Sequence, residues 1–342
     1  MTDVGMTDAA AVRGIQHCTI RTRVWRNGAL EAENFPFEQV SDYLQEPDCL
    51  VWADLMYPDH ESLLKLAEEL SLDPHAIEDA EAAAERPKAT RYTTHLFLTA
   101  YAVQHDADFA EVRLGRVSAF ATERAFVTVR LDDSLDMDAV LRRWDDNADL
   151  IKYGPRLLSH GLLDEIVDGY FETVESLDDA VEAIEDILFD ENAQAAREVS
   201  RRTFQLRRSL VQVRRVVLPM REVVNTLMHR TGADNAVELA PYYEDLYDHV
   251  LRAAEWTESL RDMITSIFET NMSLSDTRMN LVMKQLTAWA AIIAVPTAVT
   301  GYFGQNVPYP GFGQHWGFWL SVGVVVAIAL ALYVSFKRRD WL

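Results

Sequence analysis

The sequence predicts an α+β membrane protein with an N-terminal cytoplasmic α/β domain, long stalk helices and two C-terminal transmembrane helices in each subunit. Three observations lead to this fold class. Strand and helix patterns mix over residues 1–158, helical patterns without strands follow from residue 159, and residues 286–342 contain two long apolar segments. The 342 residues are enough for one sizeable soluble domain and an extended helical part.

Residues 1–158 are expected to form a domain around a central sheet. Apolar and polar residues alternate in five runs, as is typical of strands, at residues 19–25, 50–57, 96–103, 116–121 and 125–131. Helices are expected between these strands, and two of them have clear start signals. Asp59 precedes one helical pattern, and Asp73-Pro74 precedes the next, so each helix has a capping carboxylate.

Residues 159–240 are expected to form an antiparallel pair of charged helices. The stretch 164–191 is rich in Asp and Glu and contains no Lys or Arg, whereas the stretch 197–230 carries mostly Arg with apolar residues at helical spacing. Opposite charges favour packing of one stretch against the other. The alternative is that each stretch is a solvated charged face.

A single helix over residues 241–303 is expected to run from the stalk into the membrane. No Gly or Pro occurs between Pro241 and Pro296, so nothing in this stretch predicts a break. Its apolar residues recur every three or four positions, which predicts packing against other copies of the chain. We therefore expect a homo-oligomer.

The two C-terminal apolar segments differ in composition. Residues 316–336 contain no charge and match the length of about 20 residues that a spanning helix needs, so residues 316–342 are expected to be the second transmembrane helix with a basic tail. Residues 286–303 include Thr, Pro and Gly, which a membrane helix tolerates where neighbouring helices or a cavity satisfy its polar groups. This first segment is expected inside a bundle, shielded from lipid.

Basic residues flank both apolar segments on one side only. Arg278 and Lys284 precede the first segment and residues 337–339 follow the second, while the loop 304–315 has no Lys or Arg. This asymmetry predicts a multi-pass protein of the cytoplasmic (inner) membrane with both termini in the cytoplasm.

Composition also argues against several function classes. The net charge of −22 argues against nucleic acid as a partner and is consistent either with solubility or with a field that gathers cations. The sequence has no phosphate-binding glycine loop, no nucleophile constellation and no clustered His ligands, so an enzyme is not expected.

Several motifs give the chain its resemblance to a known family. The first membrane segment is directly followed by Gly304-Gln305-Asn306, and the second ends in KRRDWL at residues 337–342. The N-terminal domain contains Glu78-Asp79 followed by ERPK at residues 85–88, and the stalk contains YEDLYDH at residues 243–249. Along its whole length the chain resembles the CorA family of magnesium and cobalt channels, whose signature at the first of these places is Gly-Met-Asn. The resemblance implies a homopentameric funnel in which the first membrane helix lines the pore.

The resemblance also assigns roles in ion selection. A ring of Asn306 amide oxygens, with the backbone carbonyls of Gly304 and Gln305, is expected to recognise hydrated Mg²⁺, because Mg²⁺ releases its water reluctantly. The positions that match pore-lining residues of the family are Asn280, Met283, Leu286 and Thr297. The alternatives are an ordinary helix-terminal turn, plain helix packing, and a Thr hydroxyl bonded to its own helix.

A regulatory metal site is implied in the same way. In the family, Mg²⁺ bound between cytoplasmic subunits holds the channel closed, and the resemblance carries this role to Asp79 with Asp245, and to Glu269 nearer the membrane. Carboxylates that converge from two subunits repel each other unless a cation lies between them, which links internal Mg²⁺ to conformation. The alternative is that these are solvent-exposed acids on an acidic protein.

Two departures from the family pattern leave the transported ion open. Gln305 replaces the usual Met, and the loop lacks the acidic residue that often follows the motif, while His315 is its one ionisable side chain. The family resemblance nevertheless implies a channel for Mg²⁺, with Co²⁺ and Ni²⁺ as further substrates. The alternatives are a Zn²⁺ transporter on the same fold, proton-coupled or not, and a membrane-anchored oligomeric metal sensor without transport.

Overall fold

The computed structural model describes residues 18–82, 85–106, 111–190, 193–231, 237–305 and 308–342. These residues fall into two compact units. The first unit contains the chain up to Phe189 together with Glu198–Thr265, and the second contains Asp190–Arg197 together with Ser266–Leu342.

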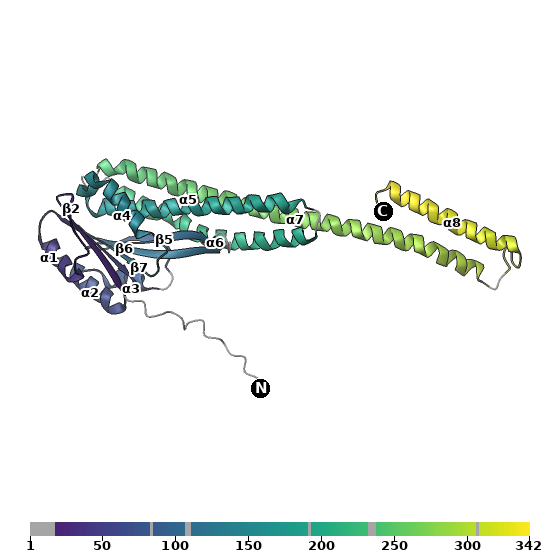
Figure 1. The fold of residues 1–342 in the computed structure, drawn as a ribbon, viewed down its shortest axis with the longest axis horizontal. Coiled ribbons are helices and arrows are strands. Elements are labelled where there is room, and N and C mark those ends of the chain that lie inside the picture. Colours follow the sequence, from purple (N-terminus) through teal and green to yellow (C-terminus); the bar gives the residue numbers. More distant parts are fainter. Residues whose placement is uncertain (1–17, 83–84, 107–110, 191–192, 232–236, 306–307) are drawn as a thin grey trace, which may run out of the picture. The chain divides into compact units, whose positions relative to one another are not determined.

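A mixed sheet forms the centre of the first unit (Figure 1). Its strands are β1 (Thr19–Arg26), β2 (Ala29–Glu33), β3 (Cys49–Met56), β4 (Lys88–Arg91), β5 (Leu96–Asp106), β6 (Glu111–Ala121) and β7 (Ala125–Arg130), in the order β2-β1-β3-β7-β6-β5-β4. Neighbouring strands are antiparallel except β3 and β7, which run parallel with Val51 opposite Ala125. Both of these central strands are apolar and buried nearly throughout, because helices cover both faces of the sheet.

Two helical layers cover the sheet. On one face, α1 (Val40–Gln45), α2 (His60–Leu70) and α3 (Pro74–Glu81) share a buried core with the β3 side chains Val51, Ala53 and Leu55. On the other face, Trp144 of α4 (Met137–Asp146) packs edge-to-face against Trp52 at 5.3 Å between ring centroids. Successive residues of a strand point to opposite faces, so β3 supplies both cores.

The helix-start signals in the sequence are confirmed. The Asp59 carboxylate accepts the backbone N–H of Ser62 at 2.8 Å at the start of α2, and the Asp73 carboxylate accepts the N–H of His75 at 2.9 Å at the start of α3. The five strands expected from alternation correspond to β1, β3, β5, β6 and β7. The short strands β2 and β4 were not predicted.

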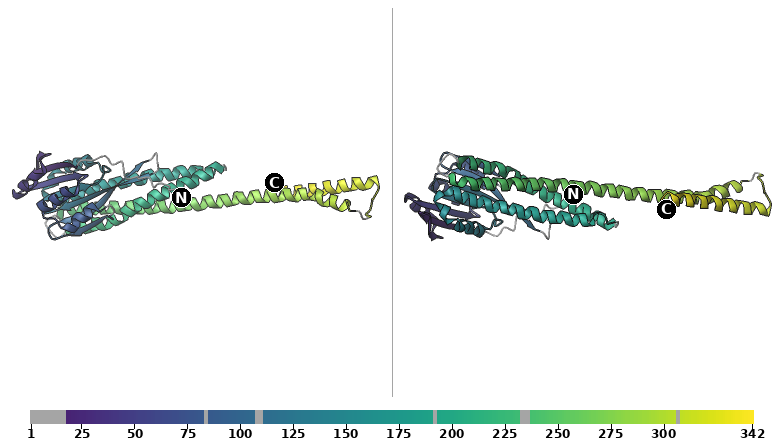
Figure 2. Two further views of the ribbon diagram at one scale, coloured as in Figure 1. Left: turned by 90° about the horizontal axis from the view of Figure 1, so that it is seen from below. Right: turned by 90° about the horizontal axis from the view of Figure 1, so that it is seen from above.

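Three long helices follow the sheet: α5 (Pro155–Leu188), α6 (Ala193–Thr231) and α7 (Ala240–Phe303). Short 3₁₀ turns precede α1 at Phe37–Gln39, α5 at Ala148–Tyr153 and α7 at Val237–Leu239. Within the first unit, α5, α6 and the beginning of α7 run side by side in all views (Figures 1 and 2). Their buried residues recur at helical spacing, for example Val174 and Val181 in α5 and Leu246 and Val250 in α7. Hydrophobic burial therefore holds these helices together.

The second unit contains the end of α7 and α8 (His315–Arg338). By length and composition, α7 and α8 are the helices in the described residues that can cross a membrane. Pro296 lies inside α7, and large apolar side chains such as Ile293 and Trp319 are exposed on the single chain. Lipid or further copies of the chain can cover such faces.

Candidate functional site

The predicted ion-selection motif begins at the end of α7. Gly304 donates its N–H to the carbonyl of Thr300 at 2.8 Å, and Gln305 donates to the carbonyl of Tyr302 at 3.4 Å, so α7 ends in a tightened turn. A Cβ atom at residue 304 would lie 2.9 Å from the Thr300 carbonyl oxygen, so the turn requires a residue as small as glycine. Asn306 lies outside the described residues.

The predicted pore-lining residues lie further back on α7. Asn280, Met283 and Leu286 are spaced by three residues, and Thr297 follows eleven residues after Leu286, close to three full turns, so all four share one side of the helix. All four are exposed in the single chain.

Two threonines in the apolar part of α7 donate hydrogen bonds to the backbone of the same helix. The Thr300 hydroxyl donates to the carbonyl of Pro296 at 2.7 Å, and the Thr287 hydroxyl donates to that of Met283, also at 2.7 Å. Such bonds satisfy the hydroxyls without a partner on another helix.

Asp79, a predicted metal ligand, lies in α3 beside a lysine of its own chain. Lys88 Nζ lies 2.8 Å from the Asp79 carboxylate and 3.1 Å from that of Glu85. Burial of Lys88 opposes its charge, but the hydrogen bonds to both carboxylates outweigh burial and raise the Lys88 pKa. The buried Arg116 guanidinium also donates to the carbonyl of Ala80 at 2.6 Å, which fixes the end of α3.

The other two predicted ligands lie in α7. The Asp245 side chain is 69% exposed, and its carboxylate lies 3.8 Å from Nε2 of His249, one helical turn later. Glu269 is exposed in the second unit. Both carboxylates are therefore accessible on a single chain.

A cluster of metal-type ligands that the sequence did not predict lies beside Asp245. Asp164 and Asp168 of α5 and His249 of α7 place ligand atoms within 4.8 Å of one another. Nδ1 of His249 is buried and has no hydrogen-bond partner among the described residues. Two carboxylates and an imidazole form a donor set suited to a divalent cation, and the imidazole favours ions such as Co²⁺, Ni²⁺ or Zn²⁺ over Mg²⁺.

Arg143 of α4 forms ion pairs with the carboxylates of this cluster. Its guanidinium pairs with Asp164, with Asp168 at 2.6 Å and with Glu165 at 2.9 Å. Burial lowers the Arg143 pKa, but the hydrogen bonds and charges of Asp168 and Asp164 outweigh burial, and the pKa is raised overall. A cation that bound the cluster would have to compete with this arginine.

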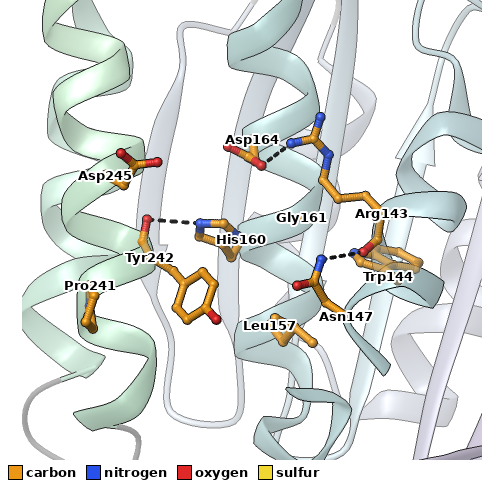
Figure 3. Close-up of a pocket in the computed structure, with 10 residues that line it drawn as sticks. All are labelled: Arg143, Trp144, Asn147, Leu157, His160, Gly161, Asp164, Pro241, Tyr242 and Asp245. Carbon is orange, nitrogen blue, oxygen red and sulfur yellow. Dashed lines mark hydrogen bonds and ion pairs between the residues drawn. The ribbon is translucent and has the colours of Figure 1, made fainter. Parts of the chain in front are cut away.

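A cavity of about 370 Å³ lies next to the cluster, between α4, α5 and the start of α7. Asp164 of α5 and Asp245 of α7 face one another across it (Figure 3). His160 Nε2 donates to the carbonyl of Tyr242 at 3.0 Å, and burial lowers the His160 pKa, so the ring is neutral. The cavity therefore brings two carboxylates together beside Arg143 and the neutral ring of His160.

The spacing within each helix was the available signal for the unpredicted cluster. Asp164 and Asp168 are four residues apart, as are Asp245 and His249, so each pair lies on one helical face. Nothing in the sequence indicates that these two faces meet, or that Arg143 enters from a third helix.

These features define a class of protein: a membrane protein in which a soluble N-terminal α/β domain continues through a long helix into a C-terminal pair of membrane spans. The family model described as CorA-like Mg²⁺ transporter protein matches residues 48–338, and the chain belongs to this family. Its members are ion transporters, so the chain is a transport protein and not an enzyme.

Similar proteins cover nearly the same length. The chain is 29% identical over 280 residues to the cobalt/magnesium transport protein CorA of Thermotoga maritima, covering 81% of this chain and 79% of that protein. It is 27% identical over 311 residues to the putative metal ion transporter YfjQ of Bacillus subtilis, covering 90% and 94%. The complete structure of the CorA magnesium transporter from Methanocaldococcus jannaschii has the same fold, with a TM-score of 0.75 at 23% identity, over 94% of this chain and 98% of that one.

Proposed function

We propose that the chain forms a homo-oligomeric channel, a pentamer, that passes Mg²⁺ and also Co²⁺ and Ni²⁺ across the cytoplasmic membrane. The observation that carries this proposal is the glycine-dependent turn at Gly304 and Gln305, directly at the outer end of a membrane-length helix. The names of the Thermotoga maritima and Methanocaldococcus jannaschii proteins support cobalt and magnesium as the transported ions.

The face of α7 that carries Asn280, Met283, Leu286 and Thr297 would line the pore. Leu286 is 63% exposed and Met283 is 53% exposed on the single chain, and copies of α7 around an axis would cover them. Apolar rings of this kind exclude water when narrow, while an amide ring at Asn280 would keep the inner entrance polar. Selection of the hydrated ion belongs to the ring of Gly304, Gln305 and Asn306.

Regulation would use the exposed carboxylate of Asp245. Lys88 already pairs with Asp79 within one chain, and Arg143 pairs with Asp164, whereas Asp245 keeps a largely exposed carboxylate. A divalent cation between subunits would draw Asp245 together with acids such as Asp79, and a second ion near Glu269 would act closer to the membrane. Internal Mg²⁺ would thereby favour the closed state.

The experiment that tests the proposal is ion flux into proteoliposomes loaded with a metal-sensitive dye. Mg²⁺, Co²⁺, Ni²⁺ and Zn²⁺ are compared with and without a pH gradient, for wild type, Asn306→Ala and the matched cytoplasmic control Asn225→Ala. We expect Mg²⁺ entry that is independent of the pH gradient, that falls at least tenfold in Asn306→Ala, and that is unchanged in the control.

Two outcomes would replace the proposal. Entry of Zn²⁺ alone, and only with a proton gradient, would identify a proton-coupled zinc transporter on the same fold. Absence of flux for every ion from a folded oligomer would identify a membrane-anchored metal sensor.

A further inference from the structure

The loop between α7 and α8 is folded on itself over residues 309–317. The N–H of Phe312 donates to the carbonyl of Tyr309 at 2.9 Å, and the N–H of Gln314 donates to that of Gly311 at 3.1 Å. These are successive turns, and they give this part of the loop a defined shape.

The Tyr309 ring holds this loop against the end of α7. It meets the ring of Phe303, the last residue of α7, at 4.9 Å between centroids and 82° between planes, and the ring of Phe312 at 5.3 Å and 89°. Tyr302 lies 6.5 Å away on the same helix end. Edge-to-face contact is a favoured geometry for aromatic pairs, so Tyr309 is wedged between the helix end and its own loop.

The other end of the loop is held by α8. Gly311 has a φ of +92° and lies against Gly317 in the first turn of α8, where a Cβ atom would be 2.4 Å from the Gly311 carbonyl oxygen. This close backbone approach fixes the point from which Tyr309 reaches back to α7.

We propose that Tyr309 is a positioning residue for ion selection, because its ring fixes the turn formed by Gly304 and Gln305. This turn lies in sequence between Phe303 and Tyr309, and the contact between these two rings holds the residues on either side of the turn close together. Closure of a short loop removes most of the conformations that an exposed glycine turn would otherwise sample. Carbonyl groups select an ion by their number and position, so a freer turn selects less well.

The inference rests on the proposed channel function, and the transport test compares Tyr309→Leu with Tyr309→Phe. Among the described residues, the side-chain contacts of Tyr309 are made by its ring, so phenylalanine should preserve them. In proteoliposomes we expect Tyr309→Leu to lower the ratio of Mg²⁺ to Ca²⁺ entry at least fivefold, while Tyr309→Phe stays within twofold of wild type. Tyr333→Leu, in the cytoplasmic half of α8, is the control for removal of a membrane aromatic.

Equal ion ratios in Tyr309→Leu and wild type would overturn the inference, as would an equal loss in Tyr309→Phe. Failure of the channel proposal gives a different pattern, because Asn306→Ala would then leave Mg²⁺ entry unchanged. The two failures are therefore distinguishable in one set of vesicles.

A second measurement does not depend on transport. A spin label on Gln305→Cys, in full-length protein with Cys18→Ser and Cys49→Ala, reports the mobility of the turn directly. We expect a restricted label with tyrosine or phenylalanine at residue 309, and a mobile label in Tyr309→Leu. A label that is equally restricted in all three oligomers would show that the ring does not position the turn.

Discussion

At the scale of single residues, the soluble domain contains a fully buried ion pair. Arg130 of β7 donates from Nη2 to the Asp54 carboxylate of β3 at 2.5 Å, and the two side chains are 6% and 1% exposed. Thr128 adds a hydrogen bond to the same carboxylate at 2.6 Å. Removing one member of such a pair leaves an uncompensated charge in the core.

Asp54→Ala should therefore destabilise the domain severely. We expect a loss of about 3–5 kcal/mol in the free energy of unfolding, because Arg130 would remain buried without its carboxylate. Asp138→Ala removes the exposed partner of Arg21 and should cost less than about 1 kcal/mol. Denaturant unfolding of the full chain in detergent, followed by tryptophan fluorescence, measures both, and similar losses would contradict the interpretation.

The residues of the candidate site were predictable only in part. The predictions of Asp79, Asp245 and the Gly304 turn came from motifs, and each motif is a short stretch of local sequence. The cluster of Asp164, Asp168 and His249 joins two helices. The arginine that pairs with it, Arg143, comes from a third helix. A local motif does not indicate which distant residues will be in contact, so the sequence alone could not predict this cluster.

At the scale of elements, alternation predicted the strands that are buried and missed those at the sheet edges. β2 is mostly exposed and β4 has four residues, so neither needs a strongly alternating pattern. A turn signal for β2 was nevertheless present. Asn27 and Gly28, with φ of 50° and 81°, connect β1 to β2, and Asn-Gly between strands is typical of a tight hairpin.

The first turn of α8 gives a prediction at the same scale. Gly317→Ala should displace the loop, because the new Cβ would lie 2.4 Å from the Gly311 carbonyl oxygen, whereas Gly323→Ala in the same helix meets nothing within 4 Å. We expect Gly317→Ala to lower the melting temperature of the oligomer by several degrees. It should also increase the mobility of a spin label attached at residue 305. Gly323→Ala should do neither, and equal behaviour of the two variants would contradict the close approach.

At the scale of the whole molecule, the net charge of −22 makes divalent cations natural ligands of the soluble part. Several acidic side chains have a cationic partner in the same chain, as Asp79 has Lys88 and Asp168 has Arg143. Asp245 is a candidate ligand whose carboxylate is 69% exposed and has a histidine nitrogen at 3.8 Å. A general attraction for cations should therefore be distinguishable from a specific site at Asp245.

Protease protection by Mg²⁺ makes this distinction. If millimolar Mg²⁺ bridges subunits at Asp245, the Mg²⁺ concentration that protects the oligomer should rise several-fold in Asp245→Asn. Glu244→Gln removes the same charge from the neighbouring exposed residue and should leave it unchanged. Limited proteolysis over a Mg²⁺ titration checks both, and an identical shift in the two variants would indicate general charge attraction instead.

Pro296 has a consequence for water inside the membrane. Within an α-helix, each carbonyl accepts a hydrogen bond from the N–H four residues later. Residue 296 is a proline and has no N–H, so the carbonyl of Ile292 lacks this donor. An unsatisfied carbonyl costs several kcal/mol in hydrocarbon, and the Thr300 hydroxyl is already bonded to the carbonyl of Pro296. The Ile292 oxygen is therefore stable where water or another polar group reaches it, so Pro296 favours a polar partner for α7 at this depth.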